Sequence, residues 1–519
     1  MSGRHLNRLK AGLLNGEFVV TCEVIPGRGA SEPAQEHELS EALRIWQTGR
    51  VHAISVTDNP GGNPAILADE ISRYFLEHDV TALTHFTLKD RNRNQIQAQL
   101  YAMQRAKLDN LLVMSGDYPV GGWQGRSRPV FDLDPVQTLQ LVSNMNNGLV
   151  NKTIKGDLRE QQASFFAGAV VNPFKYTEGE CLPQYFKLEK KIVAGAKFII
   201  LQLGYDTRKL AEVQAYLKSN NYDIPLIANI FLLSKGAANL MRKGVIAGCH
   251  VSDALFSELE QESKADDKGK AARINRAAKM VAIAKGMGFA GVHIGGFGIT
   301  AEVLNSILDQ AECMQDRWQD LADELSYGEP DGFYYFQNDM ITLAAQNELC
   351  RKRKLMRGYK ISRFFHRLVL TRNKGFYKIL SSVMNAKERK RGINRAHKLE
   401  HLGKSVLYDC MDCGDCGLEA CIYTCPMSQC PKCQRNGPCG GSFNGWCEVF
   451  PNERYCIHFK AYHRLKKYNE TSKLDSFITP PNNWDYYNTS GWSNYTHCRD
   501  NAAKRETLPP RGQRQPQED

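Results

Sequence analysis

The chain has 519 residues, of which 42% are apolar and 24% are charged. This length predicts two to four domains, and the composition excludes a disordered or fibrous protein. No run of about 18 apolar residues occurs, so we predict no transmembrane helix. The first residues lack the apolar core of a secretory signal, and we therefore expect a cytoplasmic protein whose thiols stay reduced.

The net charge of +11 is concentrated in one segment. Residues 351–404 hold 18 Lys and Arg against 2 Asp and Glu, a net charge of +16, so the rest of the chain carries −5. Such a segment indicates a local protein partner or an internal contact. Aromatic and apolar residues interleave with the charges over 361–370, which favours an amphipathic helix packed on protein over a nucleic-acid-binding surface.

Short apolar runs alternate with amphipathic stretches from residue 16 to residue 312. Each run has the length and continuous hydrophobicity of a strand buried on both faces, and helix-like segments such as 134–144 and 187–194 lie between them. Eight such strands predict an α/β fold, a (βα)8 TIM-type barrel. No GxGxxG motif follows the first run, which argues against a dinucleotide-binding sheet. The runs begin at Phe18, Ala53, Ala82, Asn110, Ala167, Phe198, Leu226 and Gly291.

Polar side chains stand at or just after the ends of these runs. Active sites of such barrels lie at the C-terminal ends of the strands, so these residues predict a catalytic mouth. Read singly, each of them also fits a simple capping role at the end of a strand. They are Glu23, Thr57, Asp58, His85, Asp117, Asn172, Gln202 and His293.

The motifs that carry these residues resemble those of methylenetetrahydrofolate reductase. The likeness covers roughly residues 16–312, and the order and spacing of the motifs make it specific. It implies a flavin, FAD in preference to FMN, that reduces 5,10-methylenetetrahydrofolate to 5-methyltetrahydrofolate, or catalyses the reverse, in one-carbon metabolism. The motifs are CEVIPGRG around Glu23, VTDNPGGNP from Val56, THFT from Thr84, SGDYP from Ser115, VNPF from Val171 and LQL from Leu201.

The resemblance implies three catalytic residues. Opening of the folate ring to an iminium cation needs a proton donor near the leaving nitrogen, and Glu23 matches the acid of the family's first strand. Its apolar neighbours predict that burial raises its pKa. Asp117 matches an acid near the flavin that stabilises the cation, and Gln202 matches an amide that hydrogen-bonds the pterin.

The resemblance also implies a set of flavin contacts. Three lysines on the segment 187–194, Lys187, Lys190 and Lys191, correspond to a helix that reaches the cofactor's ribose and phosphates, although a solvated helix face is the alternative for Lys190. The other matching positions are Thr57, Asp58, His85, Ser115, Gly116, Asp117, Phe131, Asp132 and Asn172.

Two positions depart from the family pattern. Gly236 stands where members carry a Phe that stacks on nicotinamide and pterin, and Gly295 stands where they carry an aromatic residue after the last strand. Phe231 or Phe297 is a candidate substitute in space. These changes leave the folate reaction in place and open the choice of electron donor between NAD(P)H and another protein.

The segment from Cys410 to Cys456 is a predicted metal-binding module, similar to the C-terminal domain fused to or partnered with some bacterial members of the family. In a reducing compartment such a density of thiols indicates metal ligation, because repeated C-x2-C turns aim two thiolates at one metal. Ten thiols complete two four-ligand sites with two to spare, and His458 would help to approach a third. The predicted ligands are Cys410, Cys413, Cys416, Cys421, Cys425, Cys430, Cys433, Cys439, Cys447 and Cys456.

The metal stays open between zinc and a [4Fe-4S] cluster. Thiolate sites suit both. The spacing from Cys410 to Cys416 with a later Cys425-Pro426 is similar to bacterial ferredoxins, whereas the Cys439-Gly-Gly turn and the 430–433 knuckle favour zinc. A zinc module would be structural, and an iron–sulfur module would carry electrons to the flavin.

The expected domains are the flavin- and folate-binding barrel over 16–312, a helical basic connecting segment over 313–405, the cysteine-rich metal-binding domain over 406–468 and an aromatic and polar tail over 469–519. The last fifteen or so residues are expected to be disordered because they are polar and rich in proline. The alternative to an enzyme is a non-catalytic barrel that scaffolds a partner reductase or passes electrons to it.

Overall fold

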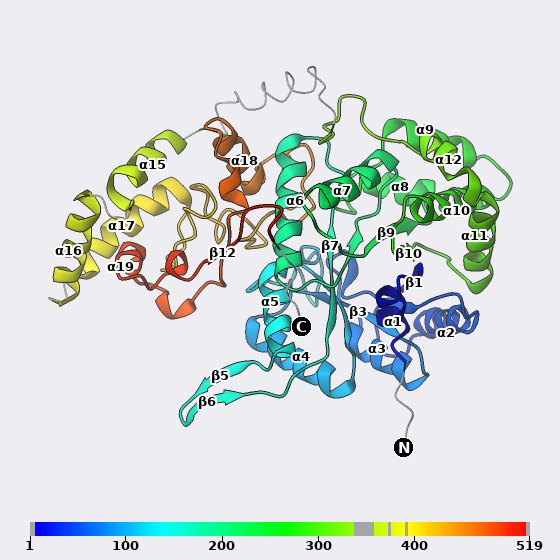
Figure 1. The fold of residues 1–519 in the computed structure, drawn as a ribbon, viewed down its shortest axis with the longest axis horizontal. Helices are drawn as coiled ribbons and strands as arrows, with labels where there is room; N and C mark the ends of the chain where they lie inside the picture. The colour runs from blue at the N-terminus through cyan, green and yellow to red at the C-terminus, as the bar shows by residue number, and fades with distance from the viewer. Residues whose placement is uncertain (1–5, 337–355, 357, 372–374, 390–392, 515–519) are drawn as a thin grey trace.

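The computed structural model describes residues 6–336, 356, 358–371, 375–389 and 393–514. Its centre is a closed barrel of eight parallel strands in the order β1-β10-β9-β8-β7-β4-β3-β2 (Figure 1). The predicted (βα)8 barrel is therefore confirmed, and each of the eight apolar runs forms one of its strands. The strands are β1 (Val19–Val24), β2 (Ala53–Val56), β3 (Ala82–Thr87), β4 (Asn110–Met114), β7 (Phe166–Val171), β8 (Phe198–Leu201), β9 (Leu226–Phe231) and β10 (Gly291–Gly295).

The barrel closes because β1 pairs with β10 on one side and with β2 on the other. Val19 lies opposite Gly291, and Thr21 lies opposite Ala53. A close approach fixes this register, since a Cβ on Gly291 would stand 2.1 Å from the carbonyl oxygen of Val19. The interior is filled by side chains that include Leu83 and Phe198.

Helices surround the barrel, and α1 (Arg8–Leu14) closes its N-terminal end by inserting Leu9 and Leu13 into the interior cluster. The opposite, C-terminal end is thereby left as the mouth. The surrounding helices are α2 (Pro33–Gln47), α3 (Ala68–Glu77), α4 (Arg93–Ala106), α5 (Pro135–Asn146), α6 (Glu178–Val193), α7 (Thr207–Ser219), α8 (Lys235–Arg242), α9 (Asp253–Glu262), α10 (Lys270–Gly286), α11 (Ala301–Met314) and α12 (Trp318–Glu324).

A hairpin of β5 (Val150–Thr153) and β6 (Gly156–Arg159) is inserted between α5 and β7 and projects from the barrel (Figure 1). The sequence analysis did not predict it. Its residues are mostly exposed, so it lacks the buried apolar run by which the barrel strands were recognised.

The helices of the basic segment and α19 gather at one end of the molecule, away from the barrel (Figure 1). The cysteine-rich module lies between them and the barrel and has little regular structure until α18, which packs on α6. The expected elements over 337–355 fall outside the described residues. The helices are α15 (Tyr359–Phe365) with a π-helical turn over His366–Leu370, α16 (Gly375–Arg389), α17 (Ile393–Tyr408), α18 (Ile457–Lys466) and α19 (Gly491–Thr496).

The C-terminal tail is folded as far as Arg514, which corrects the expectation for most of the last fifteen residues. β11 (Phe477–Ile478) pairs with β12 (Glu506–Thr507), and Leu508 is buried in the core around the barrel. The Arg514 guanidinium is also buried and forms ion pairs with Glu189 of α6 and with Asp475. The polar composition misled the prediction because these charges are paired inside the protein. None of the described helices is long and apolar enough to cross a membrane.

Candidate active site and thiol centres

Three ionisable side chains converge inside the barrel mouth. Glu23 of β1, His85 of β3 and His293 of β10 bring their ligand-type atoms within 4.8 Å of one another. The second ring nitrogens are held by hydroxyls, since Thr21 Oγ1 lies 2.9 Å from Nδ1 of His293 and Ser55 Oγ lies 2.8 Å from Nε2 of His85. The His293 ring is therefore fixed with Nε2 turned toward the Glu23 carboxylate, an arrangement that suits proton transfer.

The pKa of Glu23 is lowered, not raised as the sequence predicted. Burial does oppose ionisation, but hydrogen bonding to His293 and the charge of that ring outweigh it. The carboxylate lies 3.6 Å from Nε2 of His293. Burial lowers the pKa of His85 to about 4, so this second ring is neutral near pH 7. The prediction failed because the partner comes from the opposite end of the barrel sequence.

The mouth is open beside Glu23 because β10 ends in a glycine. A Cβ on Gly295 would stand 3.2 Å from Oε1 of Glu23, so a larger residue here would fill the space over the carboxylate. The departure from the family pattern noted at Gly295 therefore leaves room next to the proposed acid. Gly236, the other departure, lies at the start of α8, where an added Cβ would meet only the Ser234 hydroxyl, at 3.9 Å.

Asp117 and Gln202 lie on loops at the strand ends, and each accepts a backbone hydrogen bond. The Gly61 N–H of the Pro60–Gly62 turn donates to Asp117 Oδ2 over 2.8 Å, and the Leu203 N–H donates to Gln202 Oε1 over 2.9 Å. Asp117 is exposed and Gln202 half-buried. Both side chains are held in place while they stay accessible from the mouth.

Several predicted flavin contacts are buried and already bonded to protein. Thr57 and Ser115 are buried at the ends of β2 and β4. Asp58 accepts the Thr87 N–H over 2.9 Å and forms an ion pair with Arg91, which holds its pKa low against the effect of burial. These contacts shape the wall of the mouth.

The long loop after β4 carries two further predicted contacts, Phe131 and Asp132. Phe131, with φ 45°, stacks on Tyr118 with ring centroids 6.3 Å apart. Asp132 receives the Arg93 guanidinium and, over 2.9 Å, the indole N–H of Trp484. The loop is thus fastened both to α4 and to the C-terminal tail.

The cysteine-rich module is seated directly on the barrel mouth. The Lys432 ammonium donates to the carbonyl of Gly116 over 2.8 Å, and the Asn172 amide donates to the carbonyl of Gly440 over 2.8 Å. Lys175 donates to the carbonyl of Ser442. Two residues predicted as flavin contacts, Gly116 and Asn172, therefore also position the module.

The three lysines of α6 face protein rather than an open phosphate site. Lys187 donates to the side chain of Gln434 over 2.7 Å and to two carbonyls of the module, at Gly437 and Pro438. Lys190 lies over the ring of Phe477, and Lys191 donates to the carbonyl of Val170. Burial lowers the pKa of Lys190 to about 8 and that of Lys191 to about 7. All three ammonium groups thus contact protein at the places where the resemblance implied a cofactor phosphate.

Asp134 joins the barrel to the module through both of its carboxylate oxygens. Oδ1 caps α5 by accepting the N–H groups of Val136 and Gln137. Oδ2 accepts the backbone N–H of Asn436 over 2.9 Å, and that of Arg435 over 3.3 Å. The side chain is 1% exposed, so these donors have no access to water as a substitute.

Asp134→Ala should therefore destabilise the protein more than the loss of an ordinary helix cap. The lost cap costs about 1 kcal/mol, and the buried donors left without an acceptor bring the total to about 3 kcal/mol. Asn92→Ala is the matched control, because the exposed Asn92 caps α4 through the single Gln95 N–H and should cost about 1 kcal/mol. Thermal unfolding followed by circular dichroism measures both. Equal shifts of Tm would mean that Asp134 does not anchor the module.

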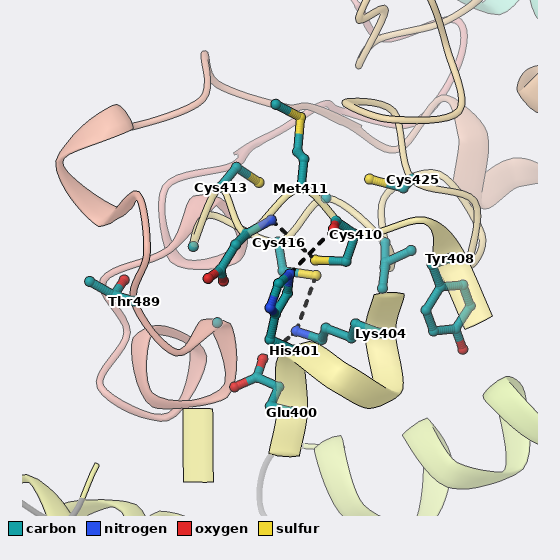
Figure 2. Close-up of a pocket in the computed structure, with 15 residues that line it drawn as sticks. Glu400, His401, Lys404, Tyr408, Cys410, Met411, Cys413, Cys416, Cys425 and Thr489 are labelled. Atoms are coloured by element: carbon teal, nitrogen blue, oxygen red, sulfur yellow. Dashed lines mark hydrogen bonds and ion pairs between the residues drawn. The ribbon is translucent and has the colours of Figure 1, made fainter. Parts of the chain in front are cut away.

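Four thiols surround a cavity at the outer side of the module, and we call them the distal thiol group: Cys410, Cys413, Cys416 and Cys425 (Figure 2). Burial and the neighbouring thiols raise the pKa of Cys413 to about 12. The Lys404 ammonium lies 3.6 Å from Sγ of Cys416, and His401 and Tyr408 of α17 also line the cavity. One face of α17 is thus a wall of the distal thiol group.

A second set lies toward the barrel, and we call it the proximal thiol group: Cys430, Cys439, Cys447 and Cys456. Burial together with Cys439 and Cys447 raises the pKa of Cys456 to about 12, and burial with Cys439 raises that of Cys430. Cys421 and Cys433 do not line the cavity of the distal thiol group. Their sulfurs lie 3.9 Å from the carbonyls of Arg435 and Met427. The sequence predicts two sets of four thiols with two to spare, and the distal and proximal thiol groups are the candidates for those sets.

His458 does not complete a third centre. Its Nε2 lies 3.1 Å from the carbonyl of Gln434, and burial lowers its pKa to about 3. The ring stays neutral and holds the chain between the two thiol groups.

The thiols within each group are spread apart. Among the described residues, the one set of three or more His, Cys, Asp or Glu ligand atoms that lie within 4.8 Å of one another is Glu23, His85 and His293. A tetrahedral zinc ion with bonds of about 2.3 Å would bring its sulfurs to about 3.8 Å from one another. Neither thiol group is that compact in this structure.

Sequence reasoning missed the residues that join the two domains, above all Lys432 and Asp134. Lys432 sits between two cysteines and forms an ion pair with Glu448. Asp134 carries a visible capping signal before Pro135, but its second role depends on residues 301 and 302 positions away in the chain. No local pattern could have revealed either contact.

Comparison with known proteins supports the assignment of both parts. The family model described as methylenetetrahydrofolate reductase matches residues 8–311, and the model described as methylene-tetrahydrofolate reductase C terminal matches residues 392–485. Comparison with curated proteins gives no match.

Two similar solved structures are distant. One is an uncharacterized protein from Clostridium thermocellum that binds two copies of 5-methyl-5,6,7,8-tetrahydrofolic acid, with 15% identity, a TM-score of 0.40 and coverage of 60% of this chain and 99% of that one. The other is tryptophan synthase of Mycobacterium tuberculosis, with 12% identity, a TM-score of 0.31 and coverage of 63% and 100%. Since the first family model spans more than half of the chain, the protein belongs to the methylenetetrahydrofolate reductase family, whose members are oxidoreductases acting on methylenetetrahydrofolate.

Proposed function

We propose that the protein is a flavin-dependent methylenetetrahydrofolate reductase that receives its electrons through two iron–sulfur centres in its own C-terminal module. The observation that carries the proposal is the seating of the module on the barrel mouth through Lys432 and Asn172. This contact brings the proximal thiol group next to the positions expected to hold the flavin.

The residues at the mouth fit a flavin ring. Thr57, His85 and Ser115 offer buried polar groups at the ends of three neighbouring strands, and Gly295 leaves the space beside Glu23 open. When bound there, a flavin supplies the hydride for the methylene carbon of the folate. The protein's own part is to hold the reactants in position, to exclude water and to move a proton.

Glu23 is the group proposed to move that proton. In the direction of reduction it donates to the leaving nitrogen as the folate ring opens, and in the reverse direction it accepts the same proton as the ring closes. The lowered pKa of Glu23 in the ligand-free protein suits the base of the reverse direction. Asp117 is proposed to stabilise the cationic intermediate, and Gln202 to hydrogen-bond the pterin edge.

The two thiol groups fit iron–sulfur clusters better than zinc. Each supplies four cysteines, the ligand set of a [4Fe-4S] cluster, and the thiols are too spread for one tetrahedral ion. We therefore propose iron–sulfur clusters, although the spacing of the 430–433 knuckle on its own favours zinc. Cys410, Cys413, Cys416 and Cys425 would hold one cluster, and Cys430, Cys439, Cys447 and Cys456 the other.

The position of the module also favours a protein electron donor over NAD(P)H. The chain segment 440–442 covers one side of the mouth through Asn172 and Lys175, and Gly236 provides no aromatic platform for a nicotinamide. Electrons that cannot enter at the mouth must arrive through the module. The proximal thiol group would pass electrons directly to the flavin. Cys439 adjoins Gly440 and lies near Lys432, two module residues that contact the barrel mouth.

The test is a spectrum and an elemental analysis of the anaerobically purified protein, followed by a turnover assay. We expect a brown-yellow protein with flavin, about eight iron atoms and matching sulfide per chain. It should oxidise 5-methyltetrahydrofolate with a viologen dye and fail to do so with NAD(P)+. Absence of flavin and of folate turnover would instead support the non-catalytic scaffold, and one zinc per thiol group would remove the electron route.

A further inference from the structure

We propose that the exposed face of the helical basic segment is a docking surface for an acidic, one-electron-carrying redox protein that delivers electrons to the distal thiol group. This inference rests on the proposed function, because it names the partner of the same electron route.

One face of α17 lines the distal thiol cavity through His401, Lys404 and Tyr408. The other presents Leu399, Leu402 and Val406 to solvent, with exposed fractions of 73%, 64% and 78%. The spacing of these three positions places them in one stripe along the helix. A helix with its side chains is about 10 Å across, so a protein bound on this stripe would lie about that far from the thiols.

Exposed apolar residues also stand on the neighbouring helices. Phe364 of α15 is 69% exposed and Ile379 of α16 is 61% exposed. Both α15, through its π-helical turn, and α17 contact α16. The exposed stripe on α17, together with these residues on the helices that contact it, is the kind of apolar surface that marks an interaction site.

The charge of the segment selects an acidic partner. Arg395 and Lys398 stand beside the apolar stripe of α17 and are exposed, as are Lys360 and Lys378 on the preceding helices. Residues 351–404 contain two carboxylates, of which Glu400 is buried in an ion pair with Lys404. An apolar patch edged by cations complements a protein with an apolar contact surrounded by carboxylates.

The stoichiometry of the reaction requires repeated docking. Reduction of the methylene group to a methyl group consumes two electrons and two protons. Two one-electron carriers must therefore bind and leave in each turnover, and the protons come from solvent. A basic surface that accelerates encounter and still permits release suits this demand better than a permanent interface does.

The experiment measures reduction of the complete protein by a small acidic bacterial ferredoxin, reduced beforehand and mixed anaerobically in a stopped-flow instrument. Leu402→Glu should lower the second-order rate about tenfold, and Lys398→Glu about threefold. The matched controls are Ile154→Glu and Lys155→Glu on the exposed β5–β6 hairpin, which should leave the rate unchanged. Raising the salt concentration from about 20 to about 300 mM should slow the unaltered protein about tenfold.

Two parallel measurements separate the possible failures. Reduction by dithionite and dye-linked methyltetrahydrofolate oxidation should be unaffected by all four substitutions, and loss of these activities in the unaltered protein would count against the proposed function itself. If those activities persist but the ferredoxin rate ignores Leu402→Glu and salt, the docking surface is refuted. It is also refuted if Leu402→Glu instead dissociates a dimer in sedimentation velocity, or abolishes binding to phosphatidylglycerol vesicles without changing the ferredoxin rate.

Discussion

Glu23→Gln should lower the rate of 5-methyltetrahydrofolate oxidation by a viologen dye by about 10²- to 10⁴-fold, while reduction of the bound flavin by dithionite stays normal. The amide keeps the size and most hydrogen-bonding capacity of the carboxylate and removes its ability to exchange a proton. The substitution leaves the two histidine rings with their hydroxyl partners, Thr21 and Ser55, so the mouth should keep its shape.

The measurement is a steady-state assay beside a single-turnover reduction of the flavin. Glu38→Gln is the control, because Glu38 lies exposed on α2 and outside the mouth. If Glu23→Gln turned over folate within a few fold of the unaltered protein, another group would have to move the proton. If it lost flavin instead, its role would be in cofactor binding, and the two results are distinguished by the visible spectrum.

The direction of the pKa shift adds a dependence on pH to this prediction. Since the pKa of Glu23 is lowered in the free protein, the carboxylate is the resting form near neutral pH. The base of the oxidation direction is then available down to a pH below the usual pKa of a glutamic acid, and kcat/KM for methyltetrahydrofolate should fall only when the pH drops through that value. In the reducing direction the requirement is the opposite, so kcat/KM should rise as the pH falls.

The barrel could be predicted from the sequence because its strands are buried on both faces. Each therefore appears as a continuous apolar run, as in Phe198–Leu201, and the polar residue that follows marks the mouth. The β5–β6 hairpin has no such run, and the tail up to Arg514 depends on ion pairs with Glu189 and Asp475 that no local pattern contains. Local patterns reveal burial within an element and leave long-range pairing unseen.

The same limit explains which site residues could be found. Glu23 and His293 were identifiable as strand-end polar groups, but their interaction reverses the expected direction of the Glu23 pKa and depends on barrel closure. Lys187 looked like a phosphate ligand because lysines on a helix near a cofactor often are, whereas its ammonium bonds to residues 434–438. The cysteine spacing predicts thiolate ligands, and the choice of metal depends on distances that spacing does not contain.

The two thiol groups predict a selective pattern of iron loss. Cys413→Ser should remove the distal cluster and Cys456→Ser the proximal one, so each variant should retain about four of about eight iron atoms. Cys498→Ser should retain all of them, because Cys498 is exposed and lies outside both groups. Cys421→Ser and Cys433→Ser should also retain them, because neither thiol belongs to the two sets of four that are proposed to hold the clusters. Iron and sulfide analysis of anaerobically purified variants is the measurement.

Cys413→Ser and Cys456→Ser should impair reduction by a protein donor to the same extent. They should differ in how firmly the module stays bound to the barrel. Either variant should lose reduction by a protein donor, because the route runs through both groups in series, while dye-linked folate oxidation should survive in Cys413→Ser. Cys456→Ser removes the centre that adjoins Lys432 and Gly440, so it should also loosen the module from the mouth. Loss of all iron in both variants would mean that the thiols form one shared centre, and unchanged iron in either would remove that cysteine from its group. If both losses follow this pattern, the series arrangement would explain how the protein works without the family's aromatic platform, since electrons that enter beside α17 would need no nicotinamide at the mouth.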